Sequence, residues 1–254
     1  MSAFWALRSP VTGCAPRYSL ESMRIALSSR GAASSNFSTA APAPEAAPPA
    51  PFAAADRLGY TPGDDVTRYV ALGTPTAAFD AWTLIDACER AERHALPDVA
   101  ARCNGITQQH RRKAGELLGT AMMAGVHGAA VAYTHIILGV PREEMLQARR
   151  DNPNIDKALS TVVEKLEEAA PRDKEAIRVL ARLYRHGNPI TGERNAEKAL
   201  VYLTAEHELV PAAGFDKARQ RYVASLTVDL TPEQVQRARE AGLQLARNCD
   251  CKEG

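Results

Sequence analysis

EAIRVLARLYRHGNPITGERNAEKALVY, residues Glu175–Tyr202, carries the clearest structural signal in this chain. It consists of two helical patterns on either side of a loop that contains Gly187. Small residues stand where two helices would have to approach closely, and leucines stand where side chains would fill the space between them. Glycine after the first pattern supplies the left-handed backbone conformation of a turn. The stretch therefore predicts an antiparallel helix hairpin.

The composition of the rest of the chain also favours helices. Aromatic residues make up only 6% of the sequence, alanine and leucine are frequent in its later part, and runs of β-branched residues are scarce. From about Thr76 onward, apolar residues such as Phe79, Trp82 and Ile85 recur every three or four positions, which is the spacing of one helix face. No segment requires a strand, so we expect an all-α fold.

Start and stop signals divide this part of the chain into separate helices. Pro141 is followed by two acids, as in a first helical turn, and Thr231 is a strong cap with Gln234 as a near-miss for a capping box. Helices are expected from about Thr76 to Ala95, at Asp98–Gln108, Gln109–Ala124 and Gly128–Leu138, from Pro141, and at Ile155–Ala169, Arg172–Arg185, Ala196–Glu208, Phe215–Leu226 and Thr231–Arg247.

One earlier segment repeats the pattern of the hairpin. Both segments have an alanine, then a leucine followed by a small residue, then a glycine that ends the helix. The matching residues, at a constant offset, are Ala114, Leu118, Gly119 and Gly125 in the earlier segment and Ala176, Leu180, Ala181 and Gly187 in the hairpin. The earlier segment is a degenerate second copy.

The hairpin resembles the Sel-one-like repeat, a relative of the tetratricopeptide repeat. In that family an Ala…Leu-Gly…Tyr…Gly helix precedes a Lys-Ala…Tyr helix; here Ala181 replaces the usual glycine. The residues that carry the resemblance are Ala176, Leu180, Tyr184, Gly187, Lys198, Ala199 and Tyr202. The resemblance implies antiparallel helix hairpins stacked as a short right-handed solenoid, used as a scaffold or adaptor, often in bacterial envelope and signalling systems. The same patterning also describes an irregular helical bundle, which would lack the concave binding face.

Residues 1–55 are expected to form a disordered tail with a Pro/Ala-rich linker, and residues 56–254 an α-helical repeat domain. The tail is rich in Arg, Ser, Ala and Pro, and residues 39–51 read TAAPAPEAAPPAP. Such a segment buries too little apolar surface to offset its ordering entropy. An organellar transit peptide also fits this composition, as does a translation start at Met23. A secretory signal fits poorly, because no apolar run in the tail is long enough.

Cys88 and Cys103 flank the helix break at Leu96-Pro97 almost symmetrically. In an antiparallel hairpin, residues equidistant from the turn face one another, so the two thiols are a candidate disulfide. The alternative is two small apolar side chains packed between the helices. A disulfide would place the protein in the periplasm or cell envelope, whereas free thiols would place it in the cytoplasm.

Cys249 and Cys251 form a C-x-C pair that we expect in a solvent-exposed tail. Structural zinc sites usually begin with a wider pair and need two further ligands, so the pair is a weak metal signal. One of the two could instead bond to Cys14.

The sequence contains no H-E-x-x-H, G-x-S-x-G or P-loop motif, and its six histidines are expected to be structural or solvated. The basic run Gln108–Lys113 reads as a solvated helix start. Glu164, Glu167 and Glu168 are expected to form i,i+3 and i,i+4 pairs with nearby lysines. No catalytic, cofactor-binding or metal-binding residue is therefore predicted.

Net charge and apolar runs limit the classes of partner. A formal charge of +1 gives no general attraction to nucleic acid. The longest apolar stretch, residues 128–140, is too short to span a bilayer. The first hypothesis is thus a non-enzymatic module for protein–protein interaction, with Tyr184 and Tyr202 as core or groove aromatics and a partner that the sequence does not name. The alternative is an enzyme whose all-α pocket gathers residues scattered along the chain.

Overall fold

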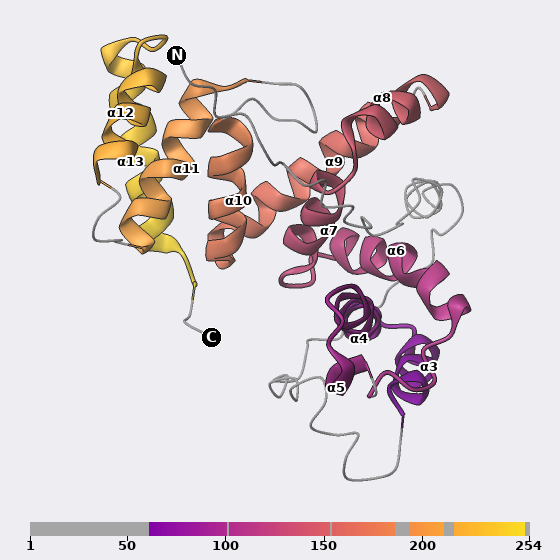
Figure 1. The fold of residues 1–254 in the computed structure, drawn as a ribbon. Helices are drawn as coiled ribbons and strands as arrows, with labels where there is room; N and C mark the ends of the chain where they lie inside the picture. The colour runs from indigo at the N-terminus through magenta and orange to yellow at the C-terminus, as the bar shows by residue number, and fades with distance from the viewer. Residues whose placement is uncertain (1–60, 101, 153, 186–193, 211–215, 252–254) are drawn as a thin grey trace, which may run out of the picture.

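The computed structural model describes residues 61–100, 102–152, 154–185, 194–210 and 216–251. These residues form helices joined by short connections, and no strand occurs among them (Figure 1). The expected all-α fold is confirmed. The predicted tail, Gly187 and most of the loop that follows it lie outside the described residues. The elements are α3 Pro62–Leu72, α4 Pro75–Arg93, α5 Pro97–Ala100, α6 Gln108–Met123, α7 Ala129–Leu138, α8 Arg142–Asp151, α9 Ile155–Ala169, the 3-10 turn η2 Ala170–Arg172, α10 Lys174–Arg185, α11 Ala196–Leu209, α12 Asp216–Thr227 and α13 Pro232–Asn248.

Capping threonines set the start of several helices. At α13 the Thr231 side chain accepts a hydrogen bond from the backbone N–H of Gln234, and the Gln234 side chain accepts one from the N–H of Thr231. The box expected to be a near-miss is therefore complete, because glutamine can fill the third position. Thr61 caps α3 in the same way with Asp64. Helix α3 was not expected, although Thr61, Pro62 and Gly73 are the start and stop signals of a helix.

The prediction of a helix at Asp98–Gln108 is wrong. Only one turn forms, α5, and the chain then turns at Asn104-Gly105 before α6 begins. Gly105 has a φ of +83°, a left-handed conformation that a continuing helix cannot contain. The start of α3 packs on this turn: Gly63 donates a hydrogen bond to the carbonyl oxygen of Asn104 (3.2 Å), and a Cβ on Gly63 would overlap Gly105. This tertiary contact replaces the predicted helix.

The helices pack mainly against their neighbours along the chain. α3 packs on α4, α4 on α6, α6 on α7 and α7 on α9; α9, α10 and α11 then follow one another, and α11 carries both α12 and α13 (Figure 1). This order is typical of successive helix hairpins. The right-handed sense of a solenoid stays a prediction.

Four of the hairpin residues named from the sequence lie in the core. Ala176, Leu180 and Ala199 have no exposed surface, Tyr184 is 1% exposed, and small side chains let α10 and α11 pack closely. In the earlier copy Ala114 and Leu118 are equally buried. Its glycine, Gly125, follows α6 with a φ of +74°, as the pattern predicts.

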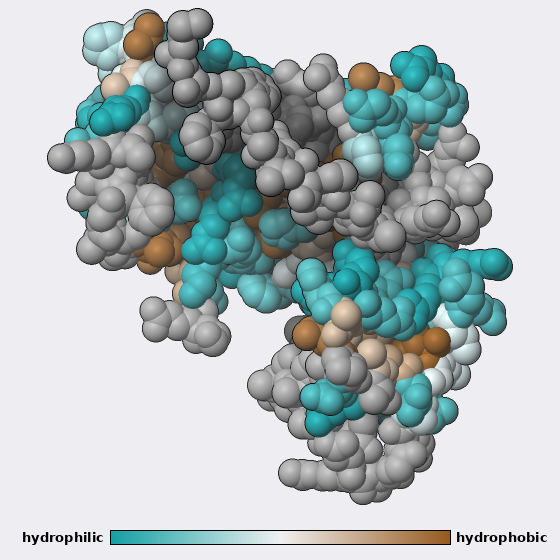
Figure 2. Space-filling view, viewed as in Figure 1, coloured by the Kyte–Doolittle hydropathy of each residue, from teal (hydrophilic) through white to brown (hydrophobic). Residues whose placement is uncertain are grey.

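The face of the molecule shown in Figure 2 is mostly polar. On the face shown in Figure 2, hydrophilic residues cover most of the coloured area, and hydrophobic residues reach it only in small patches. None of the helices in the described part of the chain combines the length and the apolar character that crossing a bilayer requires. Among the described residues, the exposed large hydrophobic side chains are scattered along the chain: Leu72, Leu96, Leu146, Val210 and Val228.

Candidate functional site

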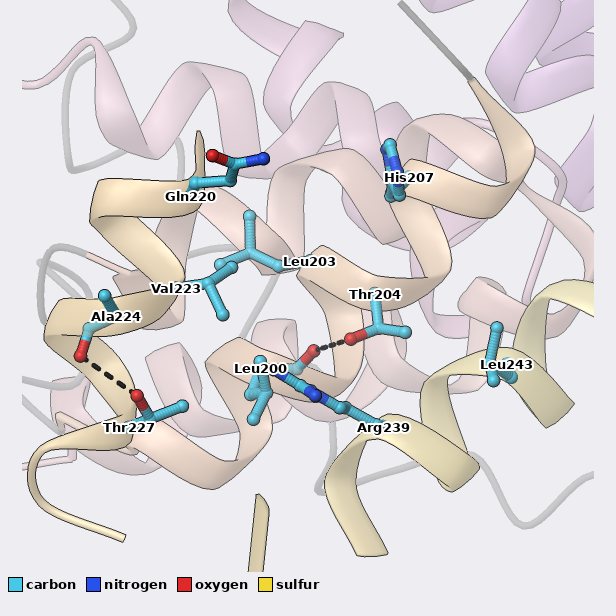
Figure 3. Close-up of a pocket in the computed structure, with 10 residues that line it drawn as sticks. All are labelled: Leu200, Leu203, Thr204, His207, Gln220, Val223, Ala224, Thr227, Arg239 and Leu243. Carbon is cyan, nitrogen blue, oxygen red and sulfur yellow. Dashed lines mark hydrogen bonds between the residues drawn. The ribbon is translucent and has the colours of Figure 1, made fainter. Parts of the chain in front are cut away.

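A groove of about 550 Å³ opens between α12 and α13, with α11 as its floor (Figure 3). Ten side chains from these three helices surround it. Most of the floor and walls are aliphatic, and the polar groups come from hydroxyl, amide, imidazole and guanidinium side chains. The apolar members are Leu200, Leu203, Val223, Ala224 and Leu243, and the polar members are Thr204, His207, Gln220, Thr227 and Arg239.

Gly242 sets the position of the α13 wall. A Cβ on this residue would overlap both the carbonyl oxygen of Val201 and the side chain of Thr204 on α11. The absence of a side chain lets α13 lie directly on α11, and this contact places the adjacent Leu243 at the edge of the groove.

The α12 wall is attached to α10 as well as to α11. Leu226 of α12 is 1% exposed, and the Tyr222 hydroxyl donates a hydrogen bond to the carbonyl oxygen of Arg185 (2.8 Å). The Arg185 guanidinium lies over the Tyr222 ring at 3.9 Å. These contacts hold α12 away from α13. The floor leucines are buried, Leu200 at 1% and Leu203 at 5% exposure, so the accessible apolar side chains are Val223, Ala224 and Leu243 on the walls.

Two of the polar groups in the groove are turned back to their own helices. Thr204 donates to the carbonyl oxygen of Leu200 (2.7 Å), and Thr227 donates to that of Ala224 (3.0 Å) (Figure 3). Their hydroxyl hydrogens are therefore used within the helix backbone. This makes the groove more apolar than its residue types suggest.

Arg239 is the exposed cation of the groove wall. No hydrogen bond or ion pair joins it to any other residue in the described ranges, whereas Arg237 on the same helix pairs with Glu197 of α11 (3.3 Å). A guanidinium beside an aliphatic surface attracts a carboxylate from a binding partner.

A second polar constellation lies between α9, α10 and α11. The Tyr184 hydroxyl and the Lys198 ammonium both donate to the same carboxylate oxygen of Glu167, each at 2.8 Å. Lys198 also donates to the Tyr184 hydroxyl (3.2 Å), and the Tyr202 ring stacks on the Tyr184 ring with a centroid distance of 5.9 Å. Burial, reinforced by the negative charge of Glu167, raises the pKa of Tyr202 well above its usual range. The cluster connects three helices through groups that satisfy one another.

This cluster revises two expectations. Glu168 forms the expected i,i+3 pair with Lys165 (2.6 Å), but Glu167 pairs across helices rather than along its own. Tyr184 and Tyr202, expected as core or groove aromatics, belong to the core: Tyr184 is buried, Tyr202 is half-buried, and neither lines the groove.

The structure joins Cys88 and Cys103 by a disulfide, with their Cα atoms 5.6 Å apart. Cys88 has no exposed surface and Cys103 is 9% exposed. The bond links α4 to the turn that replaces the predicted helix, so symmetry about Leu96-Pro97 identified the pair although the second arm is not helical.

Cys249 and Cys251 do not lie in a solvent-exposed tail. Both are half-buried against the core, and their sulfur atoms are in contact. The backbone N–H of Asp250 donates to the carbonyl oxygen of Pro171 (3.0 Å), which holds this short segment on η2. The expectation of an exposed tail is wrong. The backbone carbonyl groups of η2 accept hydrogen bonds from this segment, and sequence patterns do not reveal that contact.

The basic run Gln108–Lys113 forms the start of α6, as expected. His110 caps the helix by accepting a hydrogen bond from the N–H of Thr107 (3.3 Å), and the Arg111 guanidinium donates to both carboxylate oxygens of Glu92. These hydrogen bonds lower the pKa of the Glu92 carboxyl. Within the described ranges, no three His, Cys, Asp or Glu side chains form a group that could hold a metal ion.

Comparison with protein families, curated proteins and solved structures returned no match of any of the three kinds. The relation to the Sel-one-like repeat stays a prediction.

Proposed function

We propose that this protein is a non-catalytic helical scaffold that binds a partner protein in the groove between α12 and α13. The observation that carries the proposal is the groove itself: an open space over α11 between accessible aliphatic side chains of α12 and α13, with polar groups at its edge. Grooves of this kind between helices accept the apolar face of an amphipathic helix.

The chemistry of the groove defines the partner segment. The accessible apolar side chains of the two walls, Val223, Ala224 and Leu243, suit aliphatic side chains spaced three and four residues apart. Arg239 suits an acidic residue at the edge of that segment. The partner we propose is therefore an amphipathic helix with aliphatic anchors and a carboxylate beside them.

The buried Cys88–Cys103 disulfide supports an oxidising compartment as the place where the protein acts. Disulfides form and persist in oxidising environments and are rare in the reducing cytosol. We propose that the protein acts in such a compartment, the periplasm or the cell envelope in a bacterial host.

Site-specific photo-cross-linking in the native host tests the groove. A benzoylphenylalanine is placed at Gln220, which lines the groove, and as a control at Gln147, which is exposed on α8. The proposal expects one discrete protein adduct from position 220 and none from position 147. Equal adducts at both positions, or a cross-link only within the chain itself, would contradict it.

Matched charge insertions assign the adduct to the groove. Leu243→Arg and Val223→Lys introduce a charge on opposite walls, whereas Leu146→Arg does so on an exposed leucine of α8 (40% exposed). The two groove variants should abolish the adduct from position 220, and Leu146→Arg should leave it unchanged. Circular dichroism of each purified variant confirms that the helices are intact. An adduct that persists in both groove variants would reject the groove as the binding site.

A further inference from the structure

We propose that Cys249 and Cys251 form an exchangeable dithiol–disulfide site that reacts with small disulfides and thiols of the glutathione class. The two sulfur atoms are in contact and the Cα atoms lie 5.0 Å apart. The proposal is independent of the groove and of its partner.

The segment that carries the two cysteines is held in place at three points. The N–H of Cys249 donates to the carbonyl oxygen of Ala246 at the end of α13 (3.3 Å). The N–H of Asp250 donates to Pro171, and the Cys249 thiol lies 3.7 Å from the carbonyl oxygen of Ala170. Because the backbone is fixed on both sides of Cys249, the two sulfurs stay near one another in the folded protein. Proximity of this kind favours a bond between them over a bond to a second molecule.

Exposure separates this pair from the other disulfide of the chain. Cys88 and Cys103 are buried, at 0% and 9% exposure, whereas Cys249 and Cys251 are both half-buried and reach the solvent. Thiol–disulfide exchange needs a thiolate to approach one sulfur directly, so access decides which disulfide reacts. We therefore assign a structural role to Cys88–Cys103 and an exchange role to Cys249–Cys251.

The oxidation is a two-step exchange. The thiolate of one cysteine attacks a small disulfide RSSR, whose S–S bond breaks; a mixed disulfide forms and RS⁻ leaves. The second thiolate then attacks the mixed disulfide at the protein sulfur, forms the Cys249–Cys251 bond and releases the second RS⁻. The protein pair loses two electrons and two protons in total, and RSSR becomes two RSH. Two RSH molecules reverse the sequence.

Differential alkylation of the folded, full-length protein tests the proposal. The protein is equilibrated in buffers of graded reduced-to-oxidised glutathione ratio, quenched with acid, alkylated with N-ethylmaleimide and mapped by peptide mass spectrometry. We expect reversible conversion of Cys249 and Cys251 between the alkylated and the bonded form. The Cys88–Cys103 peptide pair should react at least about a hundredfold more slowly until denaturant is added, because its exchange requires local unfolding.

The variant Cys251→Ser provides the matched control. Without its neighbour, Cys249 should retain the mixed disulfide with glutathione, seen as a mass increase on the Cys249 peptide in oxidising buffer. Two results would overturn the proposal: both thiols staying free in the most oxidising buffer, or both disulfides resisting reduction equally in the folded protein. A dimer linked through Cys249 or Cys251 on a non-reducing gel would also overturn it.

Discussion

Gly242 of α13 lies so close to Val201 of α11 that a Cβ at position 242 would overlap the Val201 carbonyl oxygen. The groove between α12 and α13 depends on this contact, because it brings α13 onto the α11 floor. This close approach depends on how α11 and α13 pack together. Each of the two helices would form without it.

Replacing Gly242 with valine should therefore destabilise the protein. The side chain would displace α13 from α11 at a cost of roughly 1–3 kcal/mol, as is typical of overpacking. Urea unfolding followed by circular dichroism measures this change. Ala241→Val, on the exposed neighbour, is the control and should cost only the lower helix propensity of valine, about 0.6 kcal/mol. Equal effects of the two substitutions would show that the close approach is not required.

The variant Arg239→Ala should weaken binding of the proposed partner. Loss of a carboxylate pair at the edge of the groove would lower the affinity by about fivefold, or roughly 1 kcal/mol. The effect should shrink as salt rises, because exposed ion pairs are screened. Titration of the cross-linked partner, once identified, at low and high ionic strength checks this. Arg221→Ala, an exposed arginine of α12 that does not line the groove, should bind as the parent does.

Removal of the Glu167 carboxylate should destabilise the contact between α9, α10 and α11. Glu167→Ala leaves the Tyr184 hydroxyl and the Lys198 ammonium without their shared acceptor, at a cost of about 1–3 kcal/mol. Thermal unfolding compares it with Glu164→Ala, an exposed glutamate of the same helix. A loss no larger than that of the control would mean that the cluster adds nothing to stability.

One buried and one half-buried tyrosine should make the protein sensitive to alkali. Burial raises the pKa of Tyr133 to about 12 and raises that of Tyr202 as well, whereas both titrate near 10 in the unfolded chain. Between these values the unfolded state has lost protons that the folded state retains, so stability is complete below about pH 10 and falls as the pH rises further. The free energy of unfolding measured from pH 8 to 11.5 checks the direction.

The variant Tyr133→Phe separates the contribution of Tyr133 to this pH dependence from that of Tyr202. The Tyr133 hydroxyl is buried and has no hydrogen-bond partner among the described residues, so removing it should stabilise the protein by about 1 kcal/mol at neutral pH. The same substitution should reduce the loss of stability above pH 10. Tyr69→Phe, on a half-buried tyrosine of α3 whose pKa burial also raises, is the comparison: it should reduce the loss of stability above pH 10 by less and should not stabilise the protein at neutral pH. A destabilised Tyr133→Phe variant would show that the hydroxyl has a partner.

The Cys88–Cys103 bond should contribute about 3 kcal/mol, because it closes a loop of 15 residues in the unfolded chain. The double variant Cys88→Ala/Cys103→Ala measures this contribution by urea unfolding, and Cys249→Ala/Cys251→Ala should cost far less. Intact mass of protein from its native host, taken without reductant, reports whether the bond forms there. Two free thiols at these positions would remove the argument for an oxidising compartment.

Local signals predicted most of the helices well. Helix α9 spans the predicted Ile155–Ala169, and the caps at Thr231 and Asn195 place the starts of α13 and α11 where apolar periodicity places them. These features depend on residues within a few positions of one another. Helix α3 was missed although it carries local signals of the same kind: the Thr61 cap, Pro62 at its start and Gly73 after its end.

The candidate groove could not be predicted in this way. Its residues lie on three helices, and no spacing within one helix shows that α12 and α13 stand apart on α11. The sequence offered one indirect sign, Gly242 in the middle of an otherwise good helix, where glycine costs stability unless another backbone must come close.

The amino-acid sequence alone established that this chain is helical, which residues of α10 and α11 are buried, and which two cysteines could meet. Those properties follow from side-chain volume, helical period and capping, which act over a few residues. The turn at Asn104-Gly105, the Glu167 cluster and the groove were settled by the packing of one helix on another. Each needs groups far apart in the chain to come within a few ångströms, and no local preference fixes that distance.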